Sequence, residues 1–485
     1  MPYKNLREFI HALEKIGELK RIGAEVDPYL EITEIADRVS KSNGPALLFE
    51  KVKGSPYPLL INAFGSFRRM QLALNCESFD DIGGRIGALL KIQPPAGILD
   101  KIKTLFTLKE IASYAPRTVK KAPCQDTVLT AEGDASKKLL DLLPIQTCWP
   151  ADGGPFITLP LVVTKDPDTG IQNLGMYRMH RYDDSSTGMH WQYNKDGARH
   201  YEKYRKAGRR MDVAVALGGC PAVTYAATAP LPPDINELMF AGFLESRAIE
   251  VVKGKTVDLM VPAESDFVIE GYVDPDDTRI EGPFGDHTGF YSPADVYPVF
   301  HVTCITARAD AVYPSTIVGK PPMEDCYMAK ATERIFLPVM KLIAPEIADI
   351  NLPMEGVFHN CALVSIEKKY AGQAKKVINA LWGMGQMAST KCICVFDHDI
   401  NLADSGTVLW KLLNNVDPGR DFLYSQGPLD ALDHSASYPN FGGKLGIDAT
   451  RKTREEGMGR EWPDEISMKP EIVEQVTRRW KEYGL

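Results

Sequence analysis

The spacing of apolar residues changes near Phe156, and this change constrains the fold more than any other feature of the sequence. The segments 156–165, 173–182 and 188–194 are rich in β-branched and aromatic residues, and the turn sequences DPDTG and DDSSTG separate them. This pattern predicts three consecutive antiparallel strands rather than a strand–helix–strand unit. Further strands are expected at 211–218, 250–254, 258–265, 267–273 and 300–308, and inserted helices at 198–207 and 236–246. We therefore expect a central β-barrel or sandwich.

The two ends of the chain alternate helices and strands instead. Leu6, Phe9, Ile10, Leu13 and Ile16 form one apolar stripe, which predicts an amphipathic first helix. Strands are expected at 46–52 and 57–64, and Ser78 is expected to cap the next helix. Beyond residue 320, helical and extended patterns alternate again, which predicts a doubly wound α/β domain.

These patterns together predict a multidomain α/β (α+β) protein. The expected units are an N-terminal α/β domain at 1–115, a β-barrel at 116–320, a C-terminal α/β domain at 321–450 and a tail at 451–485. The tail carries an amphipathic helix in its last 16 residues, at 470–485, which we expect to dock on a neighbouring element or on another subunit.

Composition excludes several classes of protein. In 485 residues, 56 lysines and arginines face 64 acidic residues, so the formal net charge of −8 disfavours a nucleic acid or an anionic membrane as partner. The nine scattered cysteines argue against a disulfide framework and favour a reducing cytoplasm. Cys392 and Cys394 alternate with Ile393, as on one face of a buried strand. No apolar run approaches the ~18 residues of a membrane span.

The segment EGPFGDHTGFY offers the first candidate for chemistry. Glu281 and Asp286 lie five residues apart, and Gly282, Pro283 and Gly285 between them oppose a helix and favour a tight, exposed loop. Two carboxyl groups held close together push one of them toward its protonated form, and such a group can donate a proton near neutral pH. The pair would need a cation nearby. The alternative is a solvated turn between strands.

The segment QNLGMYRMHRY offers that cation. On an extended strand, Arg178 shares an otherwise apolar face with Leu174, Met176 and His180. A guanidinium at such a position is costly to bury unless it meets a carboxylate or a ligand anion. Asn173, directly after a turn, can equally be a simple turn residue.

Glu250 offers a third candidate, at the start of a predicted strand. It can form a surface ion pair, or it can join an asparagine as an oxygen ligand of Mg²⁺ or Mn²⁺. Asp397, His398 and Asp399 fit a polar loop better than a metal site. The sequence contains no GxSxG elbow, no GxGxxG after a strand and no GxxxxGK[ST], so a serine hydrolase, a dinucleotide site and a P-loop have no support.

Taken together, these segments resemble the UbiD-type decarboxylases, which use prenylated flavin mononucleotide (FMN). The resemblance spans nearly the whole chain. It is carried by LEITEIADRV, GPALLFE, APCQ, TCWP, QNLGMYR, FAGFLESRAIEVVK, EGPFGDHTGFY, VGKPP, KYAGQAKKV and DPGRD, in that order. It implies an N-terminal α/β domain, a flavin-binding split β-barrel and a C-terminal α/β domain, as in the enzymes that act on 3-polyprenyl-4-hydroxybenzoate or serve menaquinone synthesis.

The resemblance also implies roles for residues. Arg178, Glu281 and Asp286 would form the catalytic network, with Asp286, or whichever of the two acids is protonated at that moment, as the proton donor to the carbon that has lost CO₂. Asn173 and Glu250 would hold a divalent metal, manganese or magnesium, against the cofactor phosphate, and a potassium ion is also implied. The residues implied to contact the cofactor are Asn173, Met176, Tyr177, Arg178, Met189, His190, Trp191, Lys195, Glu250 and Lys391.

One departure from the family pattern lies at His190, Trp191 and Lys195. Members of the ubiquinone pathway carry an Arg-Trp pair and then an arginine, and cinnamate-type members place a histidine metal ligand near the position of Lys195. A protonated lysine cannot ligate a metal but can neutralise a phosphate. We therefore expect Lys195 to bind phosphate.

The resulting functional expectation is reversible, non-oxidative decarboxylation of an aromatic acid such as a hydroxybenzoate or a naphthoate. The implied partners are the acid, CO₂, a flavin prenyltransferase that supplies the cofactor, and further copies of the chain in a dimer or hexamer. The alternatives are a carboxylase of phenolic or polycyclic rings and a non-catalytic subunit of such a complex. A plain flavin reductase is disfavoured because no nicotinamide site is readable.

Overall fold

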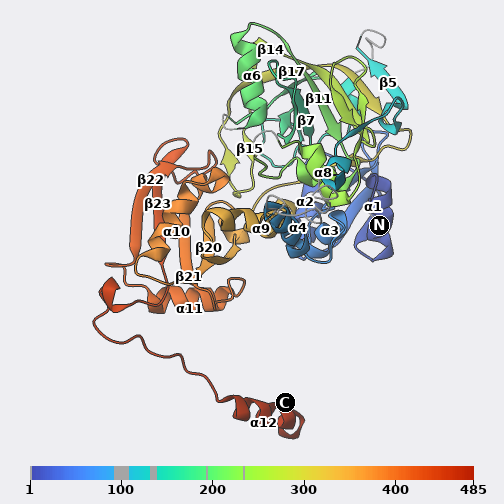
Figure 1. Cartoon of the computed structure of the whole chain (residues 1–485). Coiled ribbons are helices and arrows are strands. Elements are labelled where there is room, and N and C mark those ends of the chain that lie inside the picture. Colours follow the sequence, from blue (N-terminus) through green and yellow to red (C-terminus); the bar gives the residue numbers. More distant parts are fainter. Residues whose placement is uncertain (1–2, 92–108, 132–138, 193–194, 233–234) are drawn as a thin grey trace.

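The computed structural model describes residues 3–91, 109–131, 139–192, 195–232 and 235–485. Figure 1 shows an N-terminal unit and a central β-rich unit in contact, a C-terminal α/β unit beside them, and a tail that leads away from the C-terminal unit. The N-terminal, central and C-terminal units follow the order expected from the sequence, so the predicted fold class is confirmed.

The N-terminal unit is a small α/β layer. Its first helix buries Leu6, Phe9, Ile10 and Leu13, which confirms the predicted apolar stripe. Ser78 caps its last helix in a reciprocal capping box with Asp81, as the sequence indicated for this position. The elements are α1 (Leu6–Lys15), β1 (Leu19–Val26), α2 (Glu31–Lys41), β2 (Ala46–Val52), β3 (Leu59–Ile61), α3 (Phe67–Ala73) and α4 (Phe79–Leu90), and the sheet order is β1-β2-β3-β18 with β18 at Tyr313–Pro314.

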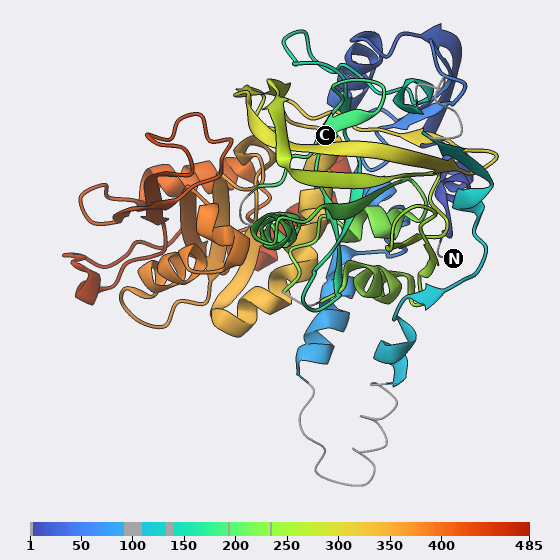
Figure 2. The same cartoon turned by 90° about the horizontal axis from the view of Figure 1, so that it is seen from above.

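The central unit is built on a seven-stranded antiparallel sheet. Its order is β10-β17-β14-β11-β7-β8, and β5 pairs with β17. The strands are β5 (Thr127–Thr130), β7 (Leu161–Lys165), β8 (Gln172–Met176), β10 (Ser186–Gly188), β11 (Met211–Leu217), β14 (Phe267–Glu281) and β17 (Asp295–Ala307). The inserted helices are α6 (Asp196–Lys206), α7 (Pro221–Ala226) and α8 (Glu237–Glu245). Figure 2 shows the long strands β14 and β17 lying side by side across this unit.

Three smaller sheets complete the central unit. They are β13-β12-β4, β6-β9 and the hairpin β15-β16. Their strands are β4 (Arg117–Thr118), β6 (Phe156–Ile157), β9 (Met179–His180), β12 (Glu250–Lys253), β13 (Met260–Pro262), β15 (Phe284–Gly285) and β16 (Tyr291–Ser292).

The predicted three-strand meander is only partly correct. β7 and β8 form the expected antiparallel hairpin, but the second strand ends at Met176, and Met179 and His180 pair with β6 instead. The predicted second turn is itself partly a strand, because Ser186–Gly188 pair with β17. Residues 189–192 lie outside any strand, and 193–194 lie outside the described residues. The cause is pairing with β17, which is far away in the sequence and which local turn signals cannot reveal.

The C-terminal unit is a doubly wound sheet, as predicted. Its order is β19-β20-β21-β23-β22, with β20, β21 and β23 parallel and both outer strands antiparallel. Side chains of α10 and α11 belong to two separate core clusters on opposite faces of β20 and β21. The elements are α9 (Glu324–Ile343), β19 (Ile347–Asn351), β20 (Cys361–Ile366), α10 (Gln373–Trp382), β21 (Cys392–Asp397), α11 (Ser405–Asn415), β22 (Phe422–Pro428) and β23 (Phe441–Asp448).

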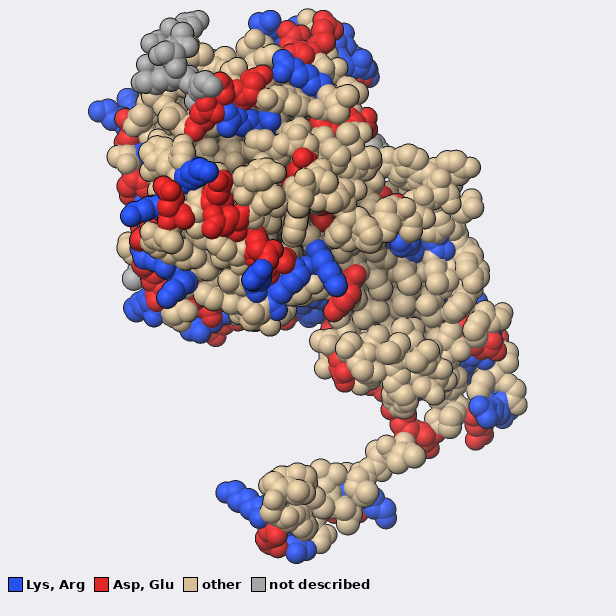
Figure 3. All heavy atoms as spheres, turned by 180° about the vertical axis from the view of Figure 1, so that it is seen from behind, with Lys and Arg blue, Asp and Glu red and all other residues tan. Residues whose placement is uncertain are grey.

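The tail ends in α12 (Pro470–Arg479), which buries none of its residues. Figure 3 shows this helix apart from the rest of the molecule, and acidic and basic side chains interspersed on the same face of the large body. Among the described residues, no helix combines the length and the apolar character needed to cross a bilayer.

Candidate active site

Arg178 joins the two carboxylates of the EGPFGDHTGFY segment. Its Nε donates to Oε1 of Glu281 at 3.0 Å, and its Nη1 donates to Oδ2 of Asp286. Its Nη2 donates to the hydroxyl of Ser292 at 3.1 Å. Arg178 lies between β8 and β9, Glu281 is the last residue of β14, and Asp286 directly follows β15. The fold therefore brings Arg178 into contact with two acids, Glu281 and Asp286, that lie 103 and 108 residues after it in the sequence.

The loop that carries both acids is buried, although the sequence suggested an exposed one. Glu281 is 1% exposed and Asp286 is 5% exposed. The amide of Gly285 donates to Oδ1 of Asp152 at 2.7 Å, which holds the hairpin against the segment before β6. A Cβ on Gly285 would lie 2.2 Å from Cδ1 of Trp149, so only glycine permits this contact. The solvated-turn alternative is therefore excluded.

Both carboxyl groups favour their ionised form in this structure. Burial would raise the pKa of Asp286, but the hydrogen bond from His287 and the charges of Arg178 and His287 outweigh burial and hold the pKa well below its ordinary value. Burial likewise opposes ionisation of Glu281, yet His190 and Arg178 lower its pKa. The expectation that one of the two acids would carry a proton is therefore wrong, because each has its own cationic or hydrogen-bonding partners.

Three histidines lie near this network, and two of them, His287 and His359, had no role in the sequence-based expectations. His190 was expected at the cofactor, and its Nδ1 lies 2.6 Å from Oε2 of Glu281. The backbone amide and Nδ1 of His287 lie 2.8 and 2.9 Å from Oδ1 of Asp286. Nε2 of His287 lies 2.8 Å from Nε2 of His359 in the C-terminal unit. The only sequence signal for His287 was its position next to Asp286.

A second polar cluster surrounds Asn173. Its Nδ2 donates to Oε1 of Glu237 at 2.7 Å, and the amide of Leu174 donates to Oε2 of the same carboxyl group at 3.0 Å. The hydroxyl of Tyr177 lies 3.4 Å from Oδ1 of Asn173. Glu237 is 8% exposed, and burial raises its pKa to about 7. Burial thus favours the neutral form of Glu237, and its ionised form would need a compensating cation or further hydrogen-bond donors.

Glu250, the expected metal ligand, lies elsewhere. It begins β12 and forms an ion pair with Arg117, which lies opposite it on β4. The structure thus gives Asn173 a different acidic neighbour, Glu237, at the first turn of α8. Sequence reasoning missed Glu237 because an acid in the first turn of a helix is ordinary helix chemistry.

The other residues expected to contact the cofactor are four residues beside the barrel sheet and two lysines, Lys195 and Lys391. Met176, Tyr177, Met189 and Trp191 are partly or fully buried beside the barrel sheet, and Nε1 of Trp191 is a buried donor with no partner among the described residues. Burial lowers the pKa of Lys195, which directly precedes α6, and the negative charges of Asp430 and Asp196 oppose this effect.

Lys391 belongs to the C-terminal unit. Its ammonium lies 2.9 Å from Oδ2 of Asp433 and 2.9 Å from the hydroxyl of Ser435. Its role at the cofactor stays a prediction, and its charge is already neutralised within its own unit.

Other candidate metal sites find no support. Among the described residues, no three His, Cys, Asp or Glu side chains are arranged to hold a metal ion. The sulfurs of Cys392 and Cys394 lie 3.8 Å apart on β21, as expected for one face of a strand. Asp399, in the loop after β21, forms an ion pair with Arg451 at 2.6 Å.

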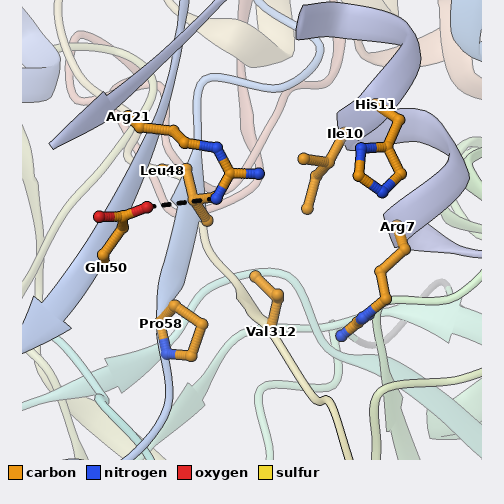
Figure 4. Close-up of a pocket in the computed structure, with 8 residues that line it drawn as sticks. All are labelled: Arg7, Ile10, His11, Arg21, Leu48, Glu50, Pro58 and Val312. Atoms are coloured by element: carbon orange, nitrogen blue, oxygen red, sulfur yellow. Dashed lines mark hydrogen bonds and ion pairs between the residues drawn. The ribbon is translucent and has the colours of Figure 1, made fainter. Parts of the chain in front are cut away.

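The pocket in Figure 4 is separate from these clusters. It has a volume of about 330 Å³ and lies between α1, β1, β2 and Val312. Its arginines are already neutralised, since Arg21 pairs with Glu14 and Glu50, and Arg7 with Asp266. This pocket therefore offers no unpaired charge for a ligand.

Comparison with known proteins identifies the family. Three sequence models of 3-octaprenyl-4-hydroxybenzoate carboxy-lyase match consecutive parts of the chain: the N-terminal domain at residues 10–86, the Rift-related domain at 117–321 and the C-terminal domain at 326–449. An uncharacterized protein of Archaeoglobus fulgidus is 51% identical over 484 residues, which cover 99% of each chain.

Solved structures agree in fold over the whole chain. The UbiD-class enzyme HmfF of Pelotomaculum thermopropionicum in complex with FMN is 29% identical, with a TM-score of 0.80 over 97% of this chain and 98% of the other. An evolved dimeric form of HmfF was solved with prenylated FMN. Vanillic acid decarboxylase of Sedimentibacter hydroxybenzoicus is 28% identical and covers 100% of this chain and 99% of the other. Its closed form gives a TM-score of 0.85 and its open form 0.79.

The three matching family models together cover most of the chain. The buried contact of Arg178 with Glu281 and Asp286 is the arrangement that the resemblance leads us to expect. The chain belongs to the UbiD family of carboxy-lyases.

Proposed function

We propose that this chain catalyses the reversible, non-oxidative decarboxylation of an aromatic carboxylic acid with prenylated FMN as cofactor. The observation that carries the proposal is the buried guanidinium of Arg178 between Glu281 and Asp286. Three of its five N–H groups are engaged by Glu281, Asp286 and Ser292, so two remain for a substrate carboxylate. Its planar fork suits such a carboxylate.

The residues around α6 fit a flavin phosphate. Lys195 directly precedes this helix, and the free backbone N–H groups of a helix start attract anions. The buried, unpartnered Nε1 of Trp191 offers a further donor, and a Cβ on Gly197 would lie 2.7 Å from it. The complexes of HmfF with FMN and prenylated FMN support the same cofactor for this chain.

We assign the divalent metal to Asn173 and Glu237 rather than to Asn173 and Glu250. The support is the closeness of the two side chains, whose contact is a 2.7 Å hydrogen bond from Nδ2 of Asn173 to Oε1 of Glu237, and the burial of Glu237; a half-turn of the amide brings Oδ1 of Asn173 to the same side. Amide and carboxylate oxygens are the donors that Mn²⁺ and Mg²⁺ prefer, and two side chains leave room for phosphate oxygens in the coordination shell. The potassium ion implied by the resemblance remains a prediction.

The chain's own residues orient the acid and deliver the proton. Prenylated FMN, when bound, supplies the electron sink that an aryl carbanion requires and that amino-acid side chains do not offer. Arg178 orients the carboxylate that leaves as CO₂, and Glu281 fixes the direction of the guanidinium through Nε. Asp286, which favours its ionised form, must first take up a proton, and it then transfers this proton to the carbon that has lost CO₂. In the carboxylation direction, Asp286 removes that proton.

The substrate class we propose is a hydroxybenzoate-like or naphthoate-like acid. The similarity to a vanillic acid decarboxylase supports the hydroxybenzoate class. A physiological carboxylase of phenolic or polycyclic rings uses the same residues in reverse. The non-catalytic subunit is less favoured, because Arg178, Glu281 and Asp286 are all present and in contact.

We further propose that the chain is a homo-oligomer and receives its cofactor from a flavin prenyltransferase. Ile472, Val473, Trp480, Tyr483 and Leu485 leave apolar surface exposed at the end of the tail. A second copy of the chain would cover that surface.

The test is a panel of aromatic acids incubated with holoenzyme in deuterated buffer. The holoenzyme is obtained by co-expression with a flavin prenyltransferase. We expect release of CO₂ and deuterium at the carbon that carried the carboxylate, both measured by mass spectrometry. Protein that binds the modified flavin but neither releases CO₂ nor exchanges deuterium with any acid would favour the non-catalytic subunit.

A further inference from the structure

A line of hydrogen bonds leads from the catalytic acid into the C-terminal unit. Oδ1 of Asp286 lies 2.9 Å from Nδ1 of His287, and Nε2 of His287 lies 2.8 Å from Nε2 of His359. His359 precedes β20 and lies 72 residues from His287 in the sequence. The hairpin β15-β16 lies on the side of the central unit that faces the C-terminal unit (Figure 1). The two histidines are therefore a direct contact between catalytic hairpin and C-terminal unit.

The geometry restricts the protonation of these groups. Asp286 is ionised and Oδ1 accepts, so Nδ1 of His287 must carry a hydrogen. Only one of the two facing Nε2 atoms can carry a hydrogen, because two N–H groups cannot point at each other. The cation is therefore on at most one of the two rings.

The surroundings place the cation on His287. Burial alone would lower its pKa, but the hydrogen bond and the charge of Asp286 raise it, with further help from Asp325 at the start of α9 and Asp430 in the C-terminal unit. Burial lowers the pKa of His359, and the charge of His287 adds to this effect against Asp430 and Asp433. His359 is thus the neutral partner that accepts the Nε2–H of His287, and its own hydrogen lies on Nδ1, a buried atom with no hydrogen-bond partner among the described residues.

We propose that His287 is the proton store of this site, and that His359 completes it only while the C-terminal unit is docked on the β15-β16 hairpin. The inference rests on the proposed decarboxylation and adds the source of its proton. His287 acts through Asp286 and is a positioning residue.

The proton balance is simple. The hydrogen on Nδ1 of His287 moves to Oδ1 of Asp286, and the imidazole becomes neutral with its remaining hydrogen on Nε2, still bonded to His359. Asp286 then transfers the proton to the carbon whose bond to the carboxylate has broken, and CO₂ leaves. One proton from solvent restores the imidazolium. Neither imidazole ring has to rotate for the transfer from His287 to Asp286, because Nδ1 and Oδ1 already face each other.

The arrangement makes proton storage depend on the position of the C-terminal unit. Without His359, the Nε2–H of the imidazolium loses its acceptor in a largely buried site, which disfavours the charged form. The ring of Phe358 stacks on His287 with centroids 5.1 Å apart, so the same segment also orients the imidazole.

The first test measures the proton directly. Full-length protein labelled with ¹⁵N-histidine is titrated by NMR, and the His287 and His359 signals are assigned among the nine histidines by their loss in His287→Asn and His359→Leu. We expect His287 to be charged and His359 neutral at pH 7. A neutral His287 at pH 7 in the wild-type protein overturns the inference.

The second test uses matched variants at His359. Glutamine at this position keeps an acceptor that reaches Nε2 of His287, whereas leucine removes it. We expect His359→Leu to move the NMR midpoint of His287, and the alkaline limb of kcat, to lower pH by about one unit, a tenfold loss of proton affinity. His359→Gln should retain most of the wild-type midpoint. Equal midpoints in the leucine variant and the wild type would contradict the role of His359.

The control is His434→Gln. The His434 ring lies 3.9 Å from Phe290, so it contacts the same hairpin from the C-terminal unit without touching His287. We expect it to leave the His287 midpoint unchanged, and an equal shift in this control would show a general loosening of the interface. Wild-type holoenzyme that decarboxylates no acid but shows the expected titration would contradict the proposed function and not the proton store. Normal turnover with a neutral His287 would contradict the proton store alone.

Discussion

Nδ1 of His190 lies 2.6 Å from Oε2 of Glu281, on the side of the carboxylate opposite the Nε of Arg178. Glu281 thus accepts one hydrogen bond on each oxygen while it is almost fully buried. The carboxylate therefore joins the segment between β8 and β9, which carries Arg178, to the segment after β10, which carries His190.

Glu281→Gln removes the charge that holds this contact. A glutamine has one acceptor oxygen and no charge, so the buried guanidinium of Arg178 loses one of its two compensating negative charges, and His190 loses either its acceptor or its protonated form. We expect a loss of about 3 kcal/mol in the free energy of unfolding, measured by urea denaturation, and a fall in kcat of about a hundredfold or more. His190→Asn, which keeps a donor near the position of Nδ1, should lose less stability. An unfolding free energy within about 0.5 kcal/mol of wild type would contradict this account.

Asp286→Asn tests the proton donor. Asparagine keeps an acceptor for Nη1 of Arg178 but cannot shuttle a proton, so we expect kcat to fall by about a thousandfold while the flavin remains bound. CO₂ release and the visible absorption of the purified protein check the two parts separately. Wild-type turnover in this variant would remove Asp286 from the mechanism.

Glu237→Gln and Glu250→Gln discriminate between the two candidate metal ligands. We expect the Glu237 variant to lose bound manganese and to retain less flavin, because a neutral amide is a weaker ligand of a divalent cation. The Glu250 variant removes a partly exposed ion pair with Arg117 and should keep its metal. The metal content per protein, measured by mass spectrometry of purified holoenzyme, decides between them. The reverse result would restore Glu250 as the ligand.

Glu324 gives a prediction about pH and stability. Its Oε1 accepts from the amide of Phe64 at 2.7 Å and its Oε2 from the hydroxyl of Thr316 at 2.7 Å. Burial raises its pKa from 4.5 to about 7, so between these values the folded protein binds more protons than the unfolded chain. Its contribution to stability is therefore complete below the unfolded value and is lost as pH rises toward 7.

Glutamine at 324 does not titrate. Its oxygen still accepts from the amide of Phe64, and its NH₂ group donates to the hydroxyl oxygen of Thr316, whose own hydrogen turns to the carbonyl of Ile317. We expect the stability difference between Glu324→Gln and wild type to change by up to about 3 kcal/mol in favour of the variant between pH 4.5 and pH 8, measured by urea denaturation. A difference that does not vary with pH would show that Glu324 has an ordinary pKa.

Deletion of residues 467–485 tests the tail. This cut leaves Glu465, which pairs with Lys411, and removes α12 with its exposed apolar side chains. We expect the truncated chain to have a smaller assembly mass by light scattering and a C-terminal unit of unchanged thermal stability. An unchanged mass would place the subunit contacts elsewhere.

The local sequence determined those helices whose apolar pattern and capping residues indicate the same boundaries. The first helix follows the stripe from Leu6 to Leu13, and Ser78 caps α4, because both signals come from residues close together in the sequence. The alternation after residue 320 likewise determined the doubly wound C-terminal unit. The family resemblance located Arg178, Glu281 and Asp286, which the fold then brings into contact.

Only the tertiary structure decided which strands pair, where the protons reside and which acid faces Asn173. The pairing of Ser186–Gly188 with β17 displaced a predicted turn, because that partner lies more than 100 residues away. Asp286 is ionised because His287 and Arg178 surround it. Glu237 meets Asn173 because the start of α8 lies against β8, and His359 meets His287 because the C-terminal unit touches the β15-β16 hairpin. The physical reason is the same in each case: charge and hydrogen-bond energies depend on distances that the chain sets only after it has folded.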